Sequence, residues 1–398
     1  MLHRLQLGQV PPKPHTVFKI NEQLLYEHCF TRLGFDGTYS ILYHFTPPHA
    51  LEQEEVLALH PGFAAAENPA PLRRRHFRTG QITGQITGQI TGQSATGVSP
   101  FLARKRLFAN PDLALWFAVA EASDPELVCN ADADELVYVY QGQGKVETPF
   151  GVLPFQAEDY VYLPRSVIHR WHLDAPCRLL IIEGLSGIDI PAYFRNASGQ
   201  LRMDAAYTHR DFQTPQWRES QWQGPATVLV KRLEQLTRLT YRHHPFDIAG
   251  WDGALWPFVF PIRAFQPRIG QVHLPPSVHT TFTGPGFVVC SFVPRLTDFH
   301  PQAIPCPYPH SSVDCDEFLF YVAGNFTSRR GIDSGSVSFH PMGLPHGPHP
   351  GAYEASIGTV RTDELAVMVD TFKPLMPTAH AYGIEDPGYQ MSWKEPTP

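Results

Sequence analysis

The chain is a succession of short apolar runs separated by turn-forming residues. Each clear run is four or five residues long and rich in β-branched or aromatic side chains, as a strand between turns should be. The best examples lie at 136–140, 160–163, 179–182, 287–290 and 318–322. The pattern predicts many short β-strands, with helical segments only in stretches such as 110–122 and 363–369.

The composition supports the same fold class. Of 398 residues, 43% are hydrophobic, 12% are aromatic and only 17% are charged, and 39 are prolines. This balance favours β-structure with many turns over helical bundles. The length is sufficient for two domains with buried cores. We therefore expect an all-β protein with few short helices.

Charge and cysteine usage exclude several classes of partner. The net charge of −7 argues against a nucleic-acid partner, and the basic clusters at 73–75 and 104–106 are interpreted as solvated loop charge. No apolar run reaches the length of a membrane helix or of a signal-peptide core. Six cysteines without CxxC spacing indicate reduced thiols. A cytoplasmic protein with no membrane partner is expected.

A short tandem repeat occupies residues 79–93, where Thr-Gly-Gln-Ile recurs with a period of four. This period suits neither a buried helix nor a buried strand, and glycine recurs in every unit. The segment is predicted to be a flexible surface insertion.

A second repeat is distant and degenerate. Glu135 followed by Gly142 matches Glu317 followed by Gly324, and a PxSxxH motif ending at His169 matches a PxGxxH motif ending 177 residues later. Both motifs recur after nearly the same number of residues, and such a duplication predicts two related β-barrels. The expected organisation is an N-terminal segment (1–107), a first barrel without metal (108–187), a connecting segment (188–255), a metal-binding barrel (256–372) and a tail (373–398).

The second copy carries a candidate metal site. His310, Glu317 and His346 supply two imidazoles and one carboxylate, the donor set of non-haem Fe(II) oxygenases. An offset of seven would place His310 and Glu317 on opposite faces of an unbroken strand, so a turn between them is expected. The first copy has Val128 where the second has His310, and His169 is expected to be a core or interface histidine.

These motifs, G(x5)PxG(x2)H and E(x6)G, resemble those of the cupin superfamily, and their duplication implies a bicupin built from two jelly-roll barrels. Ser312 stands where the usual pattern has a further histidine. More narrowly, several segments resemble the homogentisate 1,2-dioxygenase family over most of residues 120–372. They are Tyr308-Pro-His310, Asp316-Glu317-Phe318, Ser338-Phe-His340, Pro345-His346-Gly347-Pro348, 246–253 and 272–277.

The resemblance implies a reaction and a set of roles. His310, Glu317 and His346 would bind Fe(II), and His273 would be the acid/base histidine that contacts a substrate hydroxyl. The reaction would be homogentisate plus O2 to maleylacetoacetate, in tyrosine and phenylalanine catabolism. The expected partners are the aromatic substrate, O2 and further copies of the chain in a homo-oligomer.

The substrate side of the resemblance leaves alternatives open. Tyr308 and His340 would contact substrate, and Phe326 stands where family members have a second tyrosine. Gentisate or another hydroquinone is therefore an alternative substrate. A metal-dependent cupin isomerase is a second alternative, because zinc also accepts two histidines and a glutamate. A non-catalytic bicupin is disfavoured, because the three candidate ligands are all present.

Overall fold

The computed structural model describes residues 3–84, 98–219, 224–326 and 331–394. The predicted all-β fold is confirmed, because the helices of this part are two four-residue α-helices, α1 (Ala352–Ala355) and α2 (Ala379–Tyr382), and short 3-10 turns. The 3-10 turns are Thr79–Gln81, Ala192–Phe194, His209–Asp211, Ile262–Ala264, Pro276–His279 and Tyr389–Trp393. None of the helices described is long and apolar enough to cross a membrane.

The helical segments predicted at 110–122 and 363–369 are wrong. Both are strands, β9 (Leu113–Ala120) and β27 (Leu365–Thr371). Each is almost entirely buried, so its apolar residues do not alternate with polar ones. A continuous apolar run of this kind does not distinguish a buried strand from a buried helix by its period.

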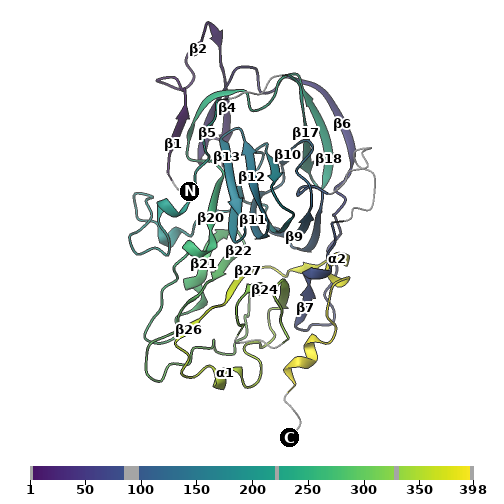
Figure 1. Cartoon of the computed structure of the whole chain (residues 1–398), viewed down its shortest axis with the longest axis vertical. Helices are drawn as coiled ribbons and strands as arrows, with labels where there is room; N and C mark the ends of the chain where they lie inside the picture. The colour runs from purple at the N-terminus through teal and green to yellow at the C-terminus, as the bar shows by residue number, and fades with distance from the viewer. Residues whose placement is uncertain (1–2, 85–97, 220–223, 327–330, 395–398) are drawn as a thin grey trace.

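The first barrel has a seven-stranded sheet and a three-stranded sheet (Figure 1). The large sheet runs β20 (Phe258–Pro261), β14 (Asp159–Leu163), β11 (Asp134–Gln141), β16 (Cys177–Gly184), β9, β8 (Arg104–Ala109) and β28 (Met376–Pro377). The small sheet runs β13 (Gly151–Gln156), β12 (Gln143–Thr148) and β15 (Arg170–Leu173).

The second barrel is built on a six-stranded antiparallel sheet. Its order is β21 (Thr280–Gly284), β22 (Phe287–Phe292), β27, β24 (Asp316–Ala323), β25 (Ser336–His340) and β7 (Arg75–Arg78). A two-stranded ribbon of β23 (Arg295–Leu296) and β26 (Arg361–Thr362) lies beside it. β7, from the N-terminal segment, thus belongs to the sheet of the second barrel, and β20 and β28 belong to that of the first. This arrangement differs from the division expected from the sequence.

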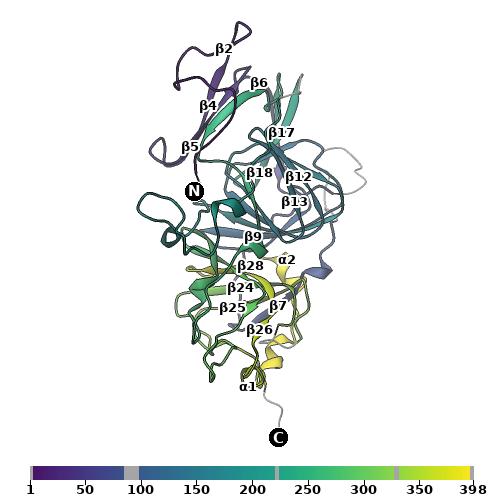
Figure 2. The ribbon, with the colours of Figure 1, turned by 60° about the vertical axis from the view of Figure 1, so that its left-hand side comes forward.

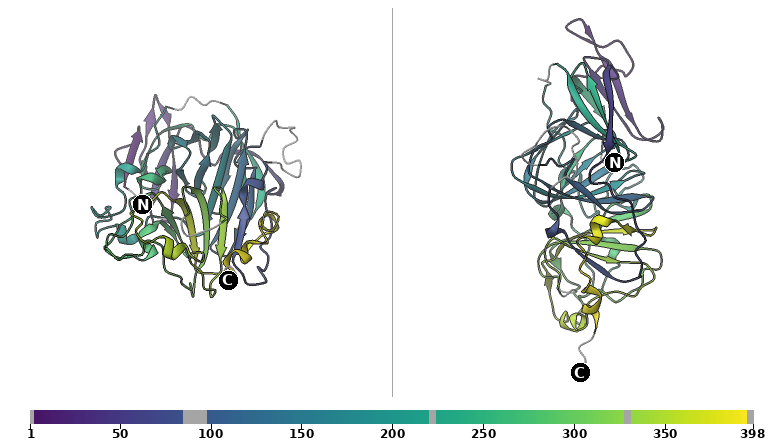
Figure 3. Two further views of the ribbon diagram at one scale, coloured as in Figure 1. Left: turned by 60° about the horizontal axis from the view of Figure 1, so that its bottom comes forward. Right: turned by 90° about the vertical axis from the view of Figure 1, so that its right-hand side faces the viewer.

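The N-terminal and connecting segments form two further four-stranded sheets, one of which also contains a strand from residues 127–130. Figure 2 and Figure 3 show these strands at one end of the molecule, the second barrel at the other and the first barrel between them. One sheet runs β1 (Leu5–Gly8), β19 (Ile248–Gly253), β5 (Tyr39–His44) and β4 (Tyr26–Thr31), and the other runs β10 (Leu127–Asn130), β17 (Ala226–Arg232), β18 (Gln235–Tyr241) and β6 (Leu51–Leu59). A small ribbon pairs β2 (Lys19–Ile20) with β3 (Gln23–Leu24).

The largest apolar core lies between the big sheets of the two barrels. Alternate residues of β24 face opposite sides, as in any strand. Phe318 and Phe320 belong to this shared core, and Phe318 packs on Phe108 of the first barrel with ring centroids 5.4 Å apart. Leu319 and Tyr321 belong instead to the interior of the second barrel. Glu317 shares their parity, so the strand directs it into that interior.

Two predictions about surface segments need correction. The first repeat unit is packed, because Thr79 and Ile82 are buried and Thr79 Oγ1 donates to the carbonyl of Gly335; the remaining repeats, from residue 85, lie outside the described residues. The clusters at 73–75 and 104–106 are not simply solvated, because Arg75 and Arg104 are both buried in ion pairs. The carboxylates that pair with these arginines are close in space but distant in sequence. The burial of the arginines therefore could not be predicted from the local sequence.

Candidate metal centre and its cavity

Glu317 lies near the start of β24, between two strands that carry further polar side chains. Its direct cross-strand neighbours are His340 of β25 and Asp370 of β27. Nδ1 of His340 lies 3.5 Å from Oε2 of Glu317. Antiparallel pairing therefore gathers three ionisable side chains on the interior face of the sheet.

His310 and His346 come from loops that pair with each other outside the sheet. β24 begins at Asp316, so His310 precedes the strand and the turn expected before Glu317 is present. The backbone N–H of each histidine donates to the carbonyl of the other at 2.8 Å. Gly347 is required here, since a Cβ on it would lie 2.7 Å from Cα of Pro309. The bridge fixes both imidazoles at the mouth of the barrel.

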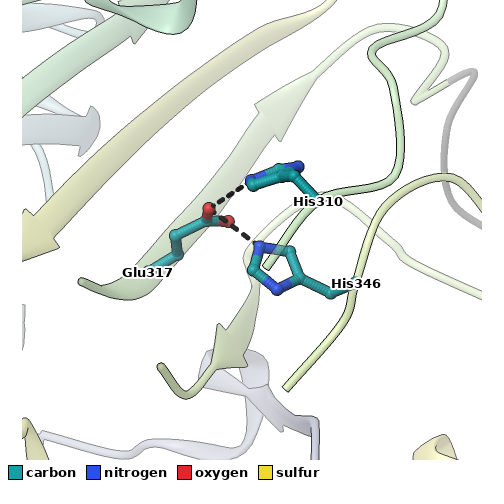
Figure 4. Close-up of side chains that lie close together, drawn as sticks. All are labelled: His310, Glu317 and His346. Carbon is teal, nitrogen blue, oxygen red and sulfur yellow. Dashed lines mark hydrogen bonds and ion pairs between the residues drawn. The ribbon is translucent and has the colours of Figure 1, made fainter. Parts of the chain in front are cut away.

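The two imidazoles converge on one carboxylate oxygen. Nε2 of His310 lies 2.9 Å and Nε2 of His346 lies 2.8 Å from Oε1 of Glu317 (Figure 4). One donor atom from each of the three side chains lies within 4.8 Å of the others, the single such cluster found among the described residues. Bonds of ~2.1 Å at right angles would hold two donors ~3.0 Å apart, so both contacts suit ligands of one metal ion.

The outer nitrogens of the same rings support a cation at this position. Nδ1 of His310 lies 3.2 Å from the carbonyl of Tyr308, and Nδ1 of His346 lies 3.0 Å from that of Leu344. These contacts place the proton on Nδ1, so Nε2 of a neutral ring presents a lone pair toward the carboxylate. Two acceptors at this distance repel unless a proton or a metal ion lies between them. The donor chemistry fits a metal.

Electrostatics keep Glu317 ionised. Burial raises the pKa of Glu317, but the neighbouring imidazoles of His310, His340 and His346 outweigh it and hold the pKa well below its usual range. Burial and then the charge of Glu317 raise the pKa of Asp370 well above its usual range. The pKa values of these two neighbouring acids are therefore shifted in opposite directions.

The metal cluster opens into a cavity of about 290 Å³. His310 and Glu317 line it together with His273, whose Nδ1 lies 3.4 Å from Oδ2 of Asp298. Tyr308 lies between the two histidines, with ring centroids 5.2 Å from His273 and 6.2 Å from His310. The structure thus brings His273 and two of the candidate ligands to one cavity, whose volume admits one aromatic ring, and packs Tyr308 against His273.

Two residues predicted to contact substrate lie behind the cavity wall. His340 is fully buried and stacks on His346, with ring centroids 4.8 Å apart, so it supports that ligand from behind. Phe326 packs on Tyr321 in an apolar cluster. Leu319 belongs both to this cluster and to the cavity wall, which places Phe326 one layer behind the cavity surface.

Sequence reasoning missed several polar side chains of the cavity, among them Asp298, Arg295 and Asp370. The distant repeat contained a signal for one of them. Glu183 lies opposite Glu135 on β16 just as Asp370 lies opposite Glu317 on β27. In each copy, the apolar run of the strand that pairs with the glutamate strand is therefore followed by an acidic residue, Glu183 or Asp370. No comparable pattern marked Arg295, which begins the two-residue strand β23, or Asp298, which follows that strand.

The first barrel holds an arginine where the second has its candidate metal cluster. Val128 pairs with His169 as His310 pairs with His346. Nη1 of Arg104 contacts the carboxylate of Glu135 and lies 3.4 Å from Oε1 of Glu183. Burial raises the pKa of Glu135, but the charge of Arg104 outweighs it and brings the pKa to about 2. Arg104 thus neutralises Glu135, and Nζ of Lys231, 3.3 Å from Oε1 of Glu183, supplies a second cation.

Comparison with known proteins agrees with this architecture. Residues 97–262 match the family model described as homogentisate 1,2-dioxygenase N-terminal. The chain is 35% identical to "Putative dioxygenase SSO1533" of Saccharolobus solfataricus, over 97% of each chain. It is 29% identical to homogentisate 1,2-dioxygenase of Rhodopseudomonas palustris, over 63% of this chain and 58% of that enzyme.

The solved structures found in the comparison include a cupin 2 conserved barrel domain protein from Leptotrichia buccalis, with a TM-score of 0.34, 9% identity and coverage of 71% of this chain and 92% of that one. The duplicated barrels and their shared motifs define a bicupin. Within the cupins, the chain belongs to the homogentisate dioxygenase family. This membership supports its assignment as a ring-cleaving dioxygenase.

Proposed function

We propose that the protein is an Fe(II)-dependent dioxygenase that converts homogentisate and O2 to maleylacetoacetate. The observation that carries the proposal is the convergence of His310 and His346 on Glu317, two imidazoles and one carboxylate at the mouth of a cavity of ring size. These three side chains would hold the iron. When bound, Fe(II) supplies the activation of O2, and both oxygen atoms enter the ring-opened product.

His273 is proposed to move the proton of a substrate hydroxyl. Its Nδ1 faces the carboxylate of Asp298 at 3.4 Å, which favours a proton on Nδ1 and leaves Nε2 as the accepting atom. Asp298 then orients the ring and stabilises the imidazolium that forms, as a carboxylate does behind a catalytic histidine. Tyr308, which packs edge-on against His273, is proposed to help position the substrate ring.

A second candidate is cleavage of gentisate or another hydroquinone. It is favoured by Phe326, which brings no hydroxyl to the position where the family has a tyrosine and which lies in an apolar cluster. A substrate with a different substituent would then be selected by other side chains. The isomerase alternative has no comparable support, because the relatives found are named as dioxygenases.

The test is anaerobic loading with Fe(II), followed by O2 consumption and ultraviolet assays with homogentisate, gentisate and unsubstituted hydroquinone. Uptake of one O2 per homogentisate with formation of maleylacetoacetate is expected. Glu354→Ala, an exposed change on α1, serves as the matched control for Glu317→Ala. Cleavage of gentisate or hydroquinone with homogentisate untouched would replace the first proposal with the second. Turnover without O2 consumption would contradict both.

A further inference from the structure

The cavity is lined by several basic side chains, and most of them already have a neighbouring partner. Arg268 forms an exposed ion pair with Asp204. His273 faces Asp298, and His310 faces Glu317. None of these groups is available to neutralise an anionic substrate without losing its own contact.

His279, a further basic residue of the wall, is also unsuited to this task. It is buried and packs against Phe292 in a tilted arrangement, with ring centroids 4.5 Å apart. Burial lowers the pKa of His279 well below its usual range, and the charges of Arg295 and His273 lower it further. The ring is therefore neutral and cannot supply a positive charge.

Arg295 differs from its neighbours. It begins β23, where pairing with Thr362 of β26 fixes its backbone, and its side chain lines the cavity half-buried. Nη1 lies 3.5 Å from the carbonyl of Val293, a long contact, and the guanidinium forms no ion pair within the described chain. Burial lowers the pKa of Arg295, partly offset by the charges of Glu364 and Asp298. A guanidinium remains charged even so.

We infer that Arg295 binds the carboxylate of the substrate, and that the cavity therefore selects hydroquinones that carry an acidic arm. The guanidinium presents a planar fork of N–H donors that matches a carboxylate bidentately. A half-buried cation without an ion pair gains most from such a partner, because water solvates it incompletely. This inference rests on the proposed function, since it assigns the anion-recognising side chain within the same cavity.

The assignment also explains how the cavity can do without a tyrosine at position 326. Phe326 offers no hydrogen bond and lies behind Leu319. Arg295 lies in the β23–β26 ribbon, whereas Phe326 follows β24 of the six-stranded sheet, so carboxylate recognition by Arg295 would not require a hydroxyl at 326.

The experiment measures calorimetric binding of two inert ligands to the anaerobic, Fe(II)-loaded protein. They are 3-hydroxyphenylacetate and its neutral amide, which differ only in the charged group. Arg295→Gln should weaken binding of the acid by about tenfold to a hundredfold, and binding of the amide by less than about threefold. Arg295→Lys, which keeps the charge but not the fork, should fall between. The matched control is Arg263→Gln, at an exposed ion pair with Glu158 outside the cavity lining, which should change the affinity for either ligand by less than about threefold.

Equal weakening of acid and amide in Arg295→Gln would assign the residue a structural role and overturn the inference. So would a parent protein that binds the two ligands alike. The proposed function is judged separately, by turnover of homogentisate. A parent that binds the acid through Arg295 but fails to cleave homogentisate would contradict the proposed function and leave the carboxylate site standing.

Discussion

Arg104 donates to Glu135 inside the first barrel, and Glu135 holds the position that Glu317 holds in the second. The two barrels thus solve one electrostatic problem in two ways. Each directs two acids into its interior from paired strands, Glu135 with Glu183 and Glu317 with Asp370. The first barrel neutralises its acids with the side chains of Arg104 and Lys231, whereas in the second barrel two imidazoles face Glu317.

Replacing Arg104 should destabilise the fold strongly. Arg104→Met leaves Glu135 buried without its cation, whereas Glu183 keeps Lys231 at 3.3 Å, and breaking a buried ion pair from one side costs ~3–5 kcal/mol. Equilibrium unfolding in denaturant measures this loss. Arg263→Met, which removes an exposed ion pair with Glu158, is the control and should change the free energy of unfolding far less. A variant as stable as the parent would refute the neutralising role of Arg104.

The second barrel is predicted to hold the single metal ion of the chain. Elemental analysis after anaerobic Fe(II) loading should give one iron per chain, and alanine at His310, Glu317 or His346 should abolish binding and O2 uptake. Circular dichroism should remain that of the parent, because the cluster lies at the barrel mouth. Full activity in Glu317→Ala, or two metal ions per chain, would contradict the assignment of a single metal site.

Much of this site was accessible from sequence because its ligands sit in fixed motifs. A strand period of two and a glycine that permits close backbone approach are local properties, so Glu317 and the loop ending at His346 could be predicted. Arg104 could not be, because its burial depends on Glu135 and Glu183, which reach it only through strand pairing. The same holds for Arg295: nothing nearby in sequence indicates that β26 brings it to the cavity.

The proton-transfer role of His273 predicts a loss of turnover with the metal retained. His273→Asn should lower kcat about 10²- to 10⁴-fold while iron content stays at one per chain. Asp298→Asn should give a smaller loss, because it removes only the carboxylate that orients the ring. The pH profile of kcat separates the roles, since the acidic limb should disappear in His273→Asn and only shift in Asp298→Asn. Loss of iron in His273→Asn would instead place the histidine among the ligands.

Acid should destabilise the protein through buried His60. Its Nε2 lies 2.8 Å from the carbonyl of Phe101 and its Nδ1 accepts from the N–H of Gly62, so the neutral ring is satisfied. Burial, followed by the charge of Arg104, lowers the pKa of His60 to about 3, against 6.5 in the unfolded chain. Between these values the unfolded state binds the extra proton. Stability therefore falls as pH drops from about 6.5 toward 3, by up to ~1.4 kcal/mol per pH unit.

The variant that tests this is His60→Gln, whose amide can keep both hydrogen bonds without titrating. Its free energy of unfolding should depend less steeply on pH between 6.5 and 4 than that of the parent. His49→Gln, at an exposed position, should keep the slope of the parent. An unaltered slope in His60→Gln would mean that other groups govern the acid response.

The position of Phe326 predicts that restoring the family's tyrosine will cost stability and change selectivity little. Phe326 is buried against Tyr321, one layer behind the cavity wall formed by Leu319. In Phe326→Tyr a hydroxyl enters an apolar cluster, which costs about 1–3 kcal/mol unless it finds a hydrogen-bond partner. The ratio of kcat/KM for homogentisate to that for hydroquinone should stay within about threefold of the parent. A marked rise in that ratio would instead show that the new hydroxyl reaches the bound ring, and would restore residue 326 to the substrate-contacting role implied by the family resemblance.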